Sequence, residues 1–475
     1  MDIIHVSAEC FPMAKAGGLG DVVGALPKYQ NQLGHTAKVV MPMYRTKFLY
    51  QNEWELVHEG SQHSGSHYFN YAIIKEKTDK LGFELYLVDI NGLLDREKIY
   101  GYDDDTQRFL AFQICVCDWI SKWQDKPDIV HCHYHHTVMI PIMFRKCFDF
   151  QHRVAVHTVF TIHNAQYQGQ FGWDRWYMLP SYDALQWGML DWDNMINPLA
   201  SAIKCAWKVT TVSPSYLQEL RYQANGVENL MQYEQGKSLG ILNGIDADVW
   251  DPSKDSMIVK NYDDHLVKEG KRRNKKELCS MFGLDPDKPL ITFIGRLVGE
   301  KAADVLPDAI RSSVYHHHGN ANFLVLGSGE PDVENRLEEV KQQLNGYVST
   351  YIGYNEGLSH LIYAGADFLL MPSRVEPCGL NQMYALRYGT VPMVRSTGGL
   401  KDTVRDFGDW QGYGIRFNHA SVGDITHSVG RAIDLYNNKK DLFTWMRSYM
   451  MHIDHSWDAS AGEYIKVYES LRGNG

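Results

Sequence analysis

Two glycine-rich turns in this sequence carry cationic side chains that could bind phosphate. The first is Lys15-Ala-Gly-Gly-Leu-Gly-Asp21, in which Gly17, Gly18 and Gly20 permit a tight turn before an apolar helix predicted over 22–33. Free N–H groups at the start of that helix and the Lys15 ammonium could bind phosphate. The spacing matches neither the dinucleotide pattern GxGxxG nor the Walker pattern GxxxxGK. A plain tight turn remains the alternative.

The second turn is Gly295-Arg-Leu-Val-Gly-Glu-Lys301, which follows a predicted strand. Arg296 with its planar fork and Lys301 with its compact charge could converge on a diphosphate. A solvated pair of charges at a strand end is the competing interpretation. Gly327 and Gly329 form a GxG turn after another strand and suit a contact with a nucleotide, although GxG alone is weakly specific.

A third constellation is Arg374-Val-Glu-Pro-Cys-Gly-Leu380, between a predicted strand and a helix predicted over 380–388. The Glu376 carboxylate and the amides that follow it could hydrogen-bond sugar hydroxyls or phosphate. The same position also suits an acid that caps the helix N-terminus. The two roles are compatible.

Histidines are concentrated in His131-Cys-His-Tyr-His-His136, and His163-Asn164 follows the next predicted strand. Histidine and cysteine are common metal ligands, but no carboxylate or CxxC pair completes a familiar ligand spacing. We therefore predict no metal site and no cofactor. Packing at a strand end and contact with a substrate remain open for these residues.

The elements that position these residues are short apolar strands alternating with helical segments. This alternation predicts βαβ units and parallel sheets, and continuous rather than alternating apolar strands indicate sheets covered on both faces. The fold class is therefore α/β, with doubly wound sheets. The expected strands are 3–6, 38–41, 84–88, 128–131, 156–162, 208–212, 290–294, 322–326, 350–353, 367–371 and 391–394.

The length of the chain indicates how many domains it forms. A chain of 475 residues exceeds what one hydrophobic core organises, so two large domains are expected. A turn-rich stretch over 243–253 places the boundary near residue 248, giving domains 1–248 and 249–454, with the C-terminal helix 455–475 rejoining the first. Ligands of open parallel sheets bind beyond the carboxyl ends of the strands, so the site is expected in a cleft between the domains.

The charge balance and the cysteines exclude several classes of protein. A formal net charge of −10 disfavours a nucleic-acid binder. The sequence shows no secretory signal, and its longest apolar run, near 138–144, is far short of a membrane span. Eight scattered cysteines indicate reduced, buried thiols. We expect a cytoplasmic protein that binds neither nucleic acid nor membrane.

The sequence resembles bacterial glycogen synthases and plant starch synthases, glycosyltransferase family 5, nearly from end to end. The motifs that carry the resemblance are AKAGGLGDVVGALP (14–27), TIHNAQYQG (161–169), TTVSPSY (210–216), GILNGID (240–246), IGRLVGEK (294–301), PSRVEPCGLNQ (372–382) and TGGLKDTV (397–404). The resemblance implies a GT-B fold, in which two Rossmann-like doubly wound domains face each other across a deep cleft. It also implies transfer of glucose from ADP-glucose to the non-reducing end of an α-1,4-glucan, such as glycogen, with retention of configuration and without a metal.

The resemblance also implies a set of site residues. Arg296 and Lys301 would hold the diphosphate, Glu376 would bind the glucosyl hydroxyls, and the backbone carbonyl of His163 would lie near the anomeric carbon. The other expected donor contacts are Lys15, Gly17, Gly18, Gly20, Asp21, Gly327, Gly329, Tyr354, Cys378, Gly379 and Leu380. The expected acceptor contacts are Tyr100, His133, Tyr134, His135, His136 and Asn164.

Three positions depart from the family pattern. Tyr134 stands where an Asp is usual, Ala302 stands where a Gly is usual, and Ser396 stands where some members have Arg. If position 302 needs a positive φ, alanine costs on the order of 1 kcal/mol there. These departures keep two alternatives open: a non-catalytic glucan- or nucleotide-binding relative, and a related retaining transferase that uses UDP-glucose or another acceptor.

Overall fold

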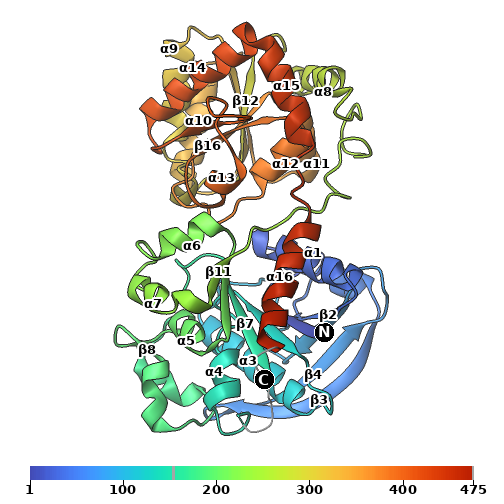
Figure 1. Ribbon diagram of the computed structural model, residues 1–475, viewed down its shortest axis with the longest axis vertical. Coiled ribbons are helices and arrows are strands. Elements are labelled where there is room, and N and C mark those ends of the chain that lie inside the picture. Colours follow the sequence, from blue (N-terminus) through green and yellow to red (C-terminus); the bar gives the residue numbers. More distant parts are fainter. Residues whose placement is uncertain (152–155, 473–475) are drawn as a thin grey trace. The chain divides into compact units, whose positions relative to one another are not determined.

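The computed structural model describes residues 1–151 and 156–472, and the chain divides into two units (Figure 1). Unit 1 comprises Met1–Gly244 and Trp457–Gly475, and unit 2 comprises Ile245–Ser456. The two segments at which the chain passes between the units are paired, since the N–H of Ile245 donates to the carbonyl of His455 at 2.8 Å. The boundary predicted from sequence at residue 248 and the return predicted at 455 lie close to these positions.

Unit 1 contains a nine-stranded sheet in the order β11-β10-β7-β6-β1-β2-β5-β4-β3 within the described residues. The strands of unit 1 are β1 (Asp2–Val6), β2 (Thr36–Pro42), β3 (Trp54–Ser64), β4 (His67–Glu76), β5 (Glu84–Asp89), β6 (Ile129–His133), β7 (His157–Ile162), β8 (Asp191–Trp192), β9 (Met195–Ile196), β10 (Lys208–Thr211) and β11 (Ser238–Gly240). Its helices are α1 (Gly18–Gln32), α2 (Lys47–Gln51), α3 (Asp105–Ser121), α4 (Ile140–Lys146), α5 (Pro198–Cys205), α6 (Pro214–Leu220), α7 (Glu228–Tyr233), α16 (Trp457–Arg472) and the 3₁₀ turns η1 (Trp173–Met178), η2 (Ala184–Met189) and η3 (Gln235–Lys237).

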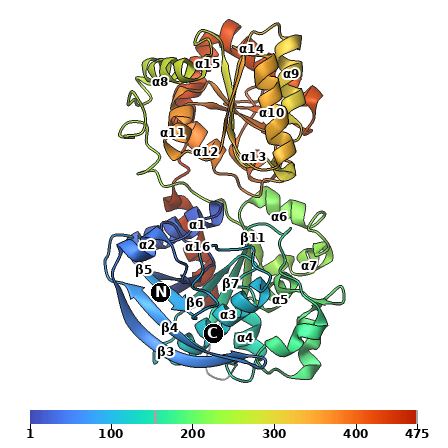
Figure 2. The same ribbon diagram turned by 180° about the vertical axis from the view of Figure 1, so that it is seen from behind.

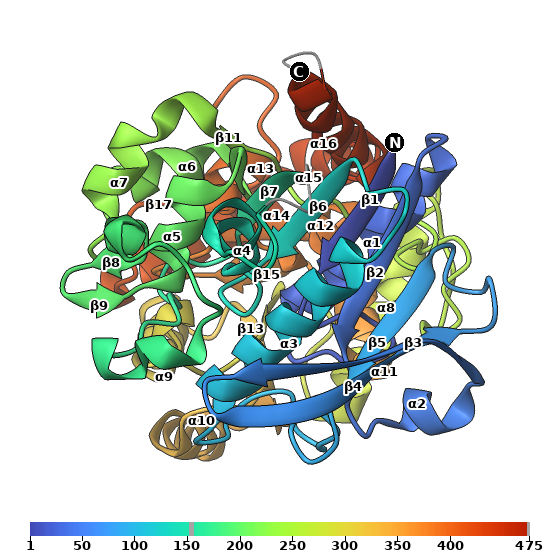
Figure 3. The same cartoon turned by 90° about the horizontal axis from the view of Figure 1, so that it is seen from below.

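The central strands of unit 1 are parallel, and the edge formed by β3 and β4 is antiparallel (Figure 3). Every residue of β6 is buried, as expected for a strand covered on both faces. In β3, buried or half-buried positions largely alternate with exposed ones because one face meets solvent. This hairpin was not predicted, because neither of its strands is a continuous apolar run.

The C-terminal helix α16 returns to unit 1 and lies beside α1 (Figures 1 and 2). Trp457, Tyr464 and Tyr468 of α16 are buried in one cluster with Val22 and Leu26 of α1. A helix of this kind holds its place through its apolar face rather than through its intrinsic propensity. The last helix of the chain is therefore part of the core of unit 1.

Unit 2 contains a parallel six-stranded sheet in the order β14-β13-β12-β15-β16-β17 within the described residues. Its strands are β12 (Leu290–Ile294), β13 (Asn322–Gly327), β14 (Val348–Ile352), β15 (Phe368–Met371), β16 (Val391–Arg395) and β17 (Ile415–Phe417). Its helices are α8 (Val267–Phe282), α9 (Leu306–His316), α10 (Pro331–Gln343), α11 (Glu356–Gly365), α12 (Asn381–Arg387), α13 (Gly398–Thr403), α14 (Val422–Asn438), α15 (Lys440–Met451) and the 3₁₀ turn η4 (Gly299–Lys301).

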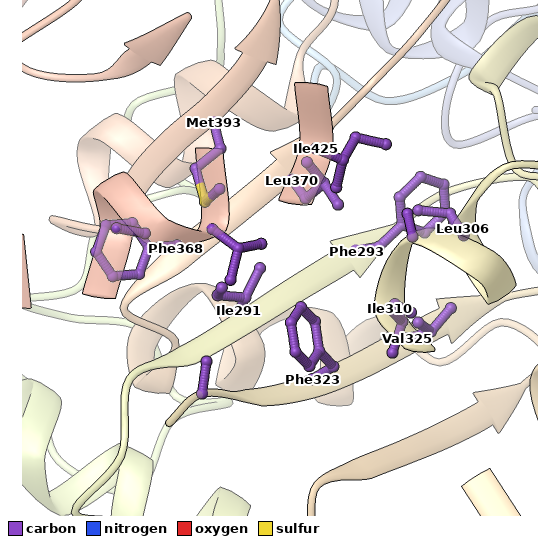
Figure 4. Close-up of a cluster of buried hydrophobic side chains, with 14 of the residues drawn as sticks. Ile291, Phe293, Leu306, Ile310, Phe323, Val325, Phe368, Leu370, Met393 and Ile425 are labelled. Atoms are coloured by element: carbon purple, nitrogen blue, oxygen red, sulfur yellow. The ribbon is translucent and has the colours of Figure 1, made fainter. Parts of the chain in front are cut away.

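The core of unit 2 joins the sheet to helices packed on it (Figure 4). Phe293, Phe323 and Phe368 from three neighbouring strands meet Leu306 of α9 and Ile425 of α14. Burial of such side chains stabilises the fold by roughly 1.5–3 kcal/mol each. The packing holds the strand ends, and hence the loops after them, in one fixed arrangement.

The predicted strands all overlap observed strands, and the strand predicted over 290–294 coincides with β12. The helices predicted over 22–33 and 380–388 correspond to α1 and α12. The eight cysteines are all free and buried, and their burial agrees with the prediction of buried thiols. No helix within residues 1–151 and 156–472 combines the length and apolarity that a membrane span needs.

A buried ion pair anchors the start of unit 2. His360 Nδ1 lies 2.7 Å from Asp255 Oδ2, and the ring stacks against Trp250 at 4.1 Å between centroids. Burial opposes the charge of His360, but the hydrogen bond to Asp255 and the Glu356 carboxylate 3.6 Å away outweigh it and raise the pKa of His360 to about 9. The pKa of Asp255 is correspondingly lowered, despite burial, by its bonds to His360 and Tyr388.

We therefore expect a pH-dependent contribution of His360 to stability. A group whose pKa is raised on folding stabilises fully below its unfolded pKa of about 6.5, and this contribution is lost as pH rises through 9. The melting-temperature difference between the wild type and His360→Gln should be largest near pH 6 and shrink by pH 9.5. His67→Gln, at an exposed position of β4, is the control. A difference that stays constant over this range would contradict the assignment.

Candidate active site

Lys301 and Glu376, two of the catalytic residues predicted in unit 2, form one ion pair. The Lys301 ammonium lies 2.7 and 2.6 Å from the two oxygens of Glu376, and the Ser373 hydroxyl donates to the same carboxylate at 2.8 Å. The Glu376 side chain is 8% exposed and that of Lys301 is 23% exposed. The pair is therefore a preorganised cation and anion at the carboxyl ends of β12 and β15.

The segments that carry this pair are tied together by further bonds. Arg374 forms a two-pronged ion pair with Asp304 at 2.6 and 2.9 Å and also donates to the carbonyl of Gly299. Gly398 has a φ of 45°, and a Cβ there would lie 2.0 Å from the carbonyl oxygen of Glu376. A side chain at position 398 would thus displace the backbone of Glu376.

The interpretation of Glu376 as an N-capping residue is wrong. The N-cap of α12 is Leu380, and no side chain caps that helix. The carboxylate binds Lys301 and Ser373 because the loop after β12 folds back on the loop after β15. This tertiary contact competes successfully with the local capping geometry.

The other residues predicted in unit 2 surround the same sheet edge. Gly327 and Gly329 are needed for close backbone packing, since a Cβ on either would meet the carbonyl oxygen of Gly295 or Leu297 at 2.0 and 2.4 Å. The Arg296 side chain is 59% exposed, with Nη2 at 3.3 Å from Glu300. Tyr354 follows β14 and is 75% exposed.

Cys378, Gly379 and Leu380 lead into α12, next to Glu376. Cys378 is buried, and Gly379 has a φ of 76°, in the region that favours glycine. The Gln382 amide donates to the carbonyls of Cys378 and Gly379 at 2.9 and 3.1 Å. These bonds fix the course of the backbone beside the ion pair.

The structure shows the local surroundings of two of the departures from the family pattern. Ala302 has a φ of 54° and a ψ of 31°, so position 302 does require the left-handed conformation that favours glycine. Ser396 accepts a hydrogen bond from Arg416 Nη2 at 2.5 Å. A guanidinium from β17 thus lies beside the position where some relatives have Arg.

In unit 1, the Gly-rich turn is held by Glu9, a residue that the sequence analysis did not select. Glu9 accepts from the amides of Ala16 and Gly17 at 2.6 and 3.0 Å and from the Tyr100 hydroxyl at 2.7 Å. Burial raises the pKa of Glu9, and these three hydrogen bonds partly offset that rise. An acid within a strand-like stretch was the available signal in the sequence.

Lys15 and Asp21 lie on the outer side of this turn and pair with each other at 2.8 Å. α1 begins at Gly18, with Gly17 as its N-cap. Gly20 is packed against Lys15, which a Cβ at position 20 would approach to 3.0 Å. Lys15 and Asp21 are more than a quarter exposed, so both can meet a ligand.

The predicted acceptor residues gather in one aromatic cluster of unit 1. Tyr100 stacks on His136 at 4.6 Å, and Tyr134 stacks on His136 and His163 at 5.7 and 5.8 Å between ring centroids. His135 contacts His136 at 3.7 Å, and Asn164 accepts from the amide of Gln166 at 2.9 Å. Tyr134 has a φ of 67°, which is strained for a bulky side chain.

Burial holds these histidines neutral. It lowers the pKa of His135 to about 4, and it holds the pKa values of His133 and His136 well below the ordinary range. His135 Nδ1 and His136 Nδ1 are buried without a hydrogen-bond partner in the described part of the chain. A buried polar atom without a hydrogen bond costs free energy. A hydroxyl group that donates to these nitrogens would remove that cost.

One histidine group has the spacing of a metal site. A nitrogen from each of His5, His131 and His133 lies within 4.8 Å of the others, and all three side chains are buried. Their ring nitrogens already form hydrogen bonds to Gln30, Tyr468, Thr161, His133 and His163. A metal would have to break these bonds, so the geometry favours a hydrogen-bonded network.

Comparison with known proteins agrees with the fold and the motifs. The family described as starch synthase catalytic domain matches residues 2–233, and glycosyl transferases group 1 matches residues 274–442. A glycogen synthase of Flavobacterium johnsoniae is 52% identical, with 99% of each chain covered, and one of Streptococcus pneumoniae is 36% identical, with 99% and 100% covered.

Two solved structures of synthases are also similar to this chain. The catalytic domain of starch synthase IV from Arabidopsis thaliana, bound to ADP and acarbose, is 29% identical with a TM-score of 0.88 and 99% of each chain covered. A sucrose-phosphate synthase from Thermosynechococcus elongatus, 15% identical, shares the fold with a TM-score of 0.63, covering 100% and 99%.

The mixed sheet of unit 1 with its parallel centre, the parallel sheet of unit 2, the paired cation and anion at the strand ends and these relatives define a class of enzyme. It is a glycosyltransferase of the GT-B fold. Within that class, the chain belongs to the glycogen and starch synthase family. The resemblance inferred from sequence is thereby confirmed.

The role of Glu9 can be tested by hydrogen exchange. Glu9→Ala removes the acceptor of the Ala16 and Gly17 amides, so exchange in a peptide covering 14–20 should accelerate at least about tenfold. Glu9→Gln, which keeps one carbonyl acceptor, should have a smaller effect. Glu55→Ala, at an exposed position of β3, is the control. Unchanged protection of that peptide in Glu9→Ala would contradict this role.

Proposed function

We propose that this enzyme transfers glucose from ADP-glucose to the non-reducing end of an α-1,4-glucan such as glycogen, with retention of configuration. The observation that carries the proposal is the Lys301–Glu376 pair at 2.6 Å, at the strand ends where parallel sheets bind ligands. The starch synthase relative that was solved with ADP and acarbose supports the choice of ADP and a glucan.

Lys301 and Arg296 would bind the diphosphate and stabilise the negative charge that grows on it as the bond to glucose breaks. The exposed Arg296 fork is available for this contact. Glu376, acting as an anion, would accept hydrogen bonds from glucosyl hydroxyls, together with the amides of Cys378, Gly379 and Leu380. The ammonium and the carboxylate hold each other in place before the substrate arrives, which limits reorganisation.

The remaining donor contacts follow from the resemblance to glycogen and starch synthases. Tyr354, which is 75% exposed, would stack on the adenine. Gly327 and Gly329 let the loop backbones approach each other closely, and Lys15, Gly17, Gly18, Gly20 and Asp21 would contact the donor from unit 1. Glu9 fixes the conformation of this turn through two hydrogen bonds. The amides and the Lys15 ammonium would therefore already be in position to bind a phosphate.

In unit 1, the carbonyl of His163 would lie near the anomeric carbon, and the acceptor hydroxyl would attack from the face that ADP leaves. This course requires no enzyme nucleophile, unlike that of retaining glycosidases with two carboxylates. Tyr100, His133, Tyr134, His135, His136 and Asn164 would contact the acceptor. A phenol at position 134 can donate a hydrogen bond and stack on a sugar, whereas the usual Asp only accepts.

The charge pair is tested by substitution. Lys301→Ala and Glu376→Ala should each lower turnover by at least about 100-fold, the effect of losing one contact to transition-state charge. Lys341→Ala is a matched control, because Lys341 pairs with Glu338 at 3.4 Å on the surface of α10. Near-normal turnover in both site variants would remove this mechanism.

The donor is tested by initial rates with labelled ADP-, UDP- and GDP-glucose and glycogen as acceptor. ADP-glucose should give the highest rate of incorporation into polymer. A clear preference for UDP-glucose would overturn the donor assignment. Binding of ADP-glucose without incorporation would indicate a non-catalytic relative whose acceptor site is altered at Tyr134.

A further inference from the structure

A line of hydrogen-bonded side chains runs through the interior of unit 1 to His163. Gln30 Oε1 of α1 lies 2.7 Å from His5 Nε2, and His5 Nδ1 lies 2.9 Å from His133 Nε2. His133 Nδ1 then lies 3.1 Å from His163 Nε2. Gln30, His5 and His133 are 0% exposed, so water does not compete for these bonds.

Burial keeps the imidazoles in this line neutral. It lowers the pKa of His5 to about 4, and it also lowers the pKa values of His133 and His163. A neutral imidazole has one N–H donor and one acceptor nitrogen. Each contact between two rings therefore holds one proton, and the direction of one bond determines the direction of the next.

The Gln30 amide sets that direction. Its NH₂ group donates to the Tyr468 hydroxyl of α16 at 3.2 Å, so its carbonyl oxygen faces His5. A carbonyl only accepts, which places the His5 proton on Nε2 and leaves Nδ1 to accept from His133. By the same step His133 carries its proton on Nε2, and His163 donates from its own Nε2.

His163 is the last ring in the line, and its Nδ1 takes no part in the line. His163 Nδ1 forms no hydrogen bond with the described part of the chain, and the ring is held by stacking with Tyr134 at 5.8 Å. With the proton on Nε2, Nδ1 presents a lone pair and can accept a hydrogen bond from a hydroxyl group. With the other tautomer it would donate instead.

We propose that Gln30 and His5 are positioning residues that hold His163 in the Nε2–H tautomer, so that Nδ1 accepts a hydrogen bond from a hydroxyl of the bound sugar. The consequence for catalysis rests on the position beside the donor sugar proposed above for His163, whereas the tautomer itself does not. The line also gives α16 a function beyond packing, because Tyr468 orients the amide from which the direction propagates.

The tautomer is measured directly by NMR of the whole chain labelled with ¹⁵N-histidine, using the two-bond ring correlations that distinguish Nε2–H from Nδ1–H. The His163 signal is assigned by its loss in His163→Gln. The expected result is Nε2–H for His163 without substrate. An Nδ1–H form in the wild type would overturn the proposal, whether or not any variant folds.

The consequence is measured with Gln30→Met, which keeps the length of the side chain and removes the amide. We expect loss of the single Nε2–H form at His163, a kcat lowered by at least about tenfold and a KM for ADP-glucose within about twofold of wild type, as expected when a histidine loses the group that fixes its tautomer.

The matched control is Gln113→Met. Gln113 is a buried glutamine of α3 in the same unit, with its own bonds to the Phe109 carbonyl and the Met139 amide, and it has no bond to this line. This control should lose comparable thermal stability and keep its kcat. Equal losses of kcat in both variants, or an unchanged His163 tautomer in Gln30→Met, would overturn the positioning role. Absence of transfer by the wild type would instead count against the proposed function.

Discussion

Parallel strand pairing is the constraint on which the rest of this structure depends. In a parallel sheet all carboxyl ends lie along one edge, so the loops that leave them must share a small space. In unit 2, the loops after β12, β13, β15 and β16 meet so closely that a Cβ on Gly327 or Gly398 would lie 2.0 Å from a neighbouring carbonyl oxygen. This crowding brings Lys301 within 2.7 Å of Glu376, although 75 residues separate them in the chain.

Unit 1 meets the same constraint with buried polar side chains. Glu9 leaves the end of β1 and binds the amides of the Gly-rich turn, while the histidines of β1 and β6 bond to one another inside the sheet. Buried polar groups are costly unless every one has a partner, and a fully bonded network is rigid. The order of the candidate site in unit 1 therefore comes from hydrogen bonds, whereas in unit 2 it comes from backbone packing and an ion pair.

The C-terminal helix contributes both to the packed core of unit 1 and to its hydrogen-bond network. The chain leaves unit 1 at Gly244, builds unit 2 and returns at Trp457 as α16. Trp457 and Tyr464 complete an apolar cluster with α1, while the Tyr468 hydroxyl bonds to both Gln30 and His131. One helix thus contributes to the core of unit 1 and to the network beneath the site.

Most strands and the tight turns can be predicted from local sequence patterns alone. The buried parallel strands are continuous apolar runs, so the segment 290–294 was located to the residue, and the glycines after β1, β12 and β13 marked where backbones turn tightly. The hairpin of β3 and β4 was missed, because an edge strand with one solvated face lacks such a run. Local sequence also allowed Glu376 to cap a helix, a role that the structure contradicts.

Which side chains contact one another depends on the folding of distant segments onto each other. Glu9 and Tyr100 are 91 residues apart, His5 and His133 are 128 apart, and His131 and Tyr468 are 337 apart. The residue type determines whether a side chain can donate or accept a hydrogen bond. Strand order and helix packing then determine its partner. Burial then fixes its charge, because desolvation acts only once the chain has folded around it.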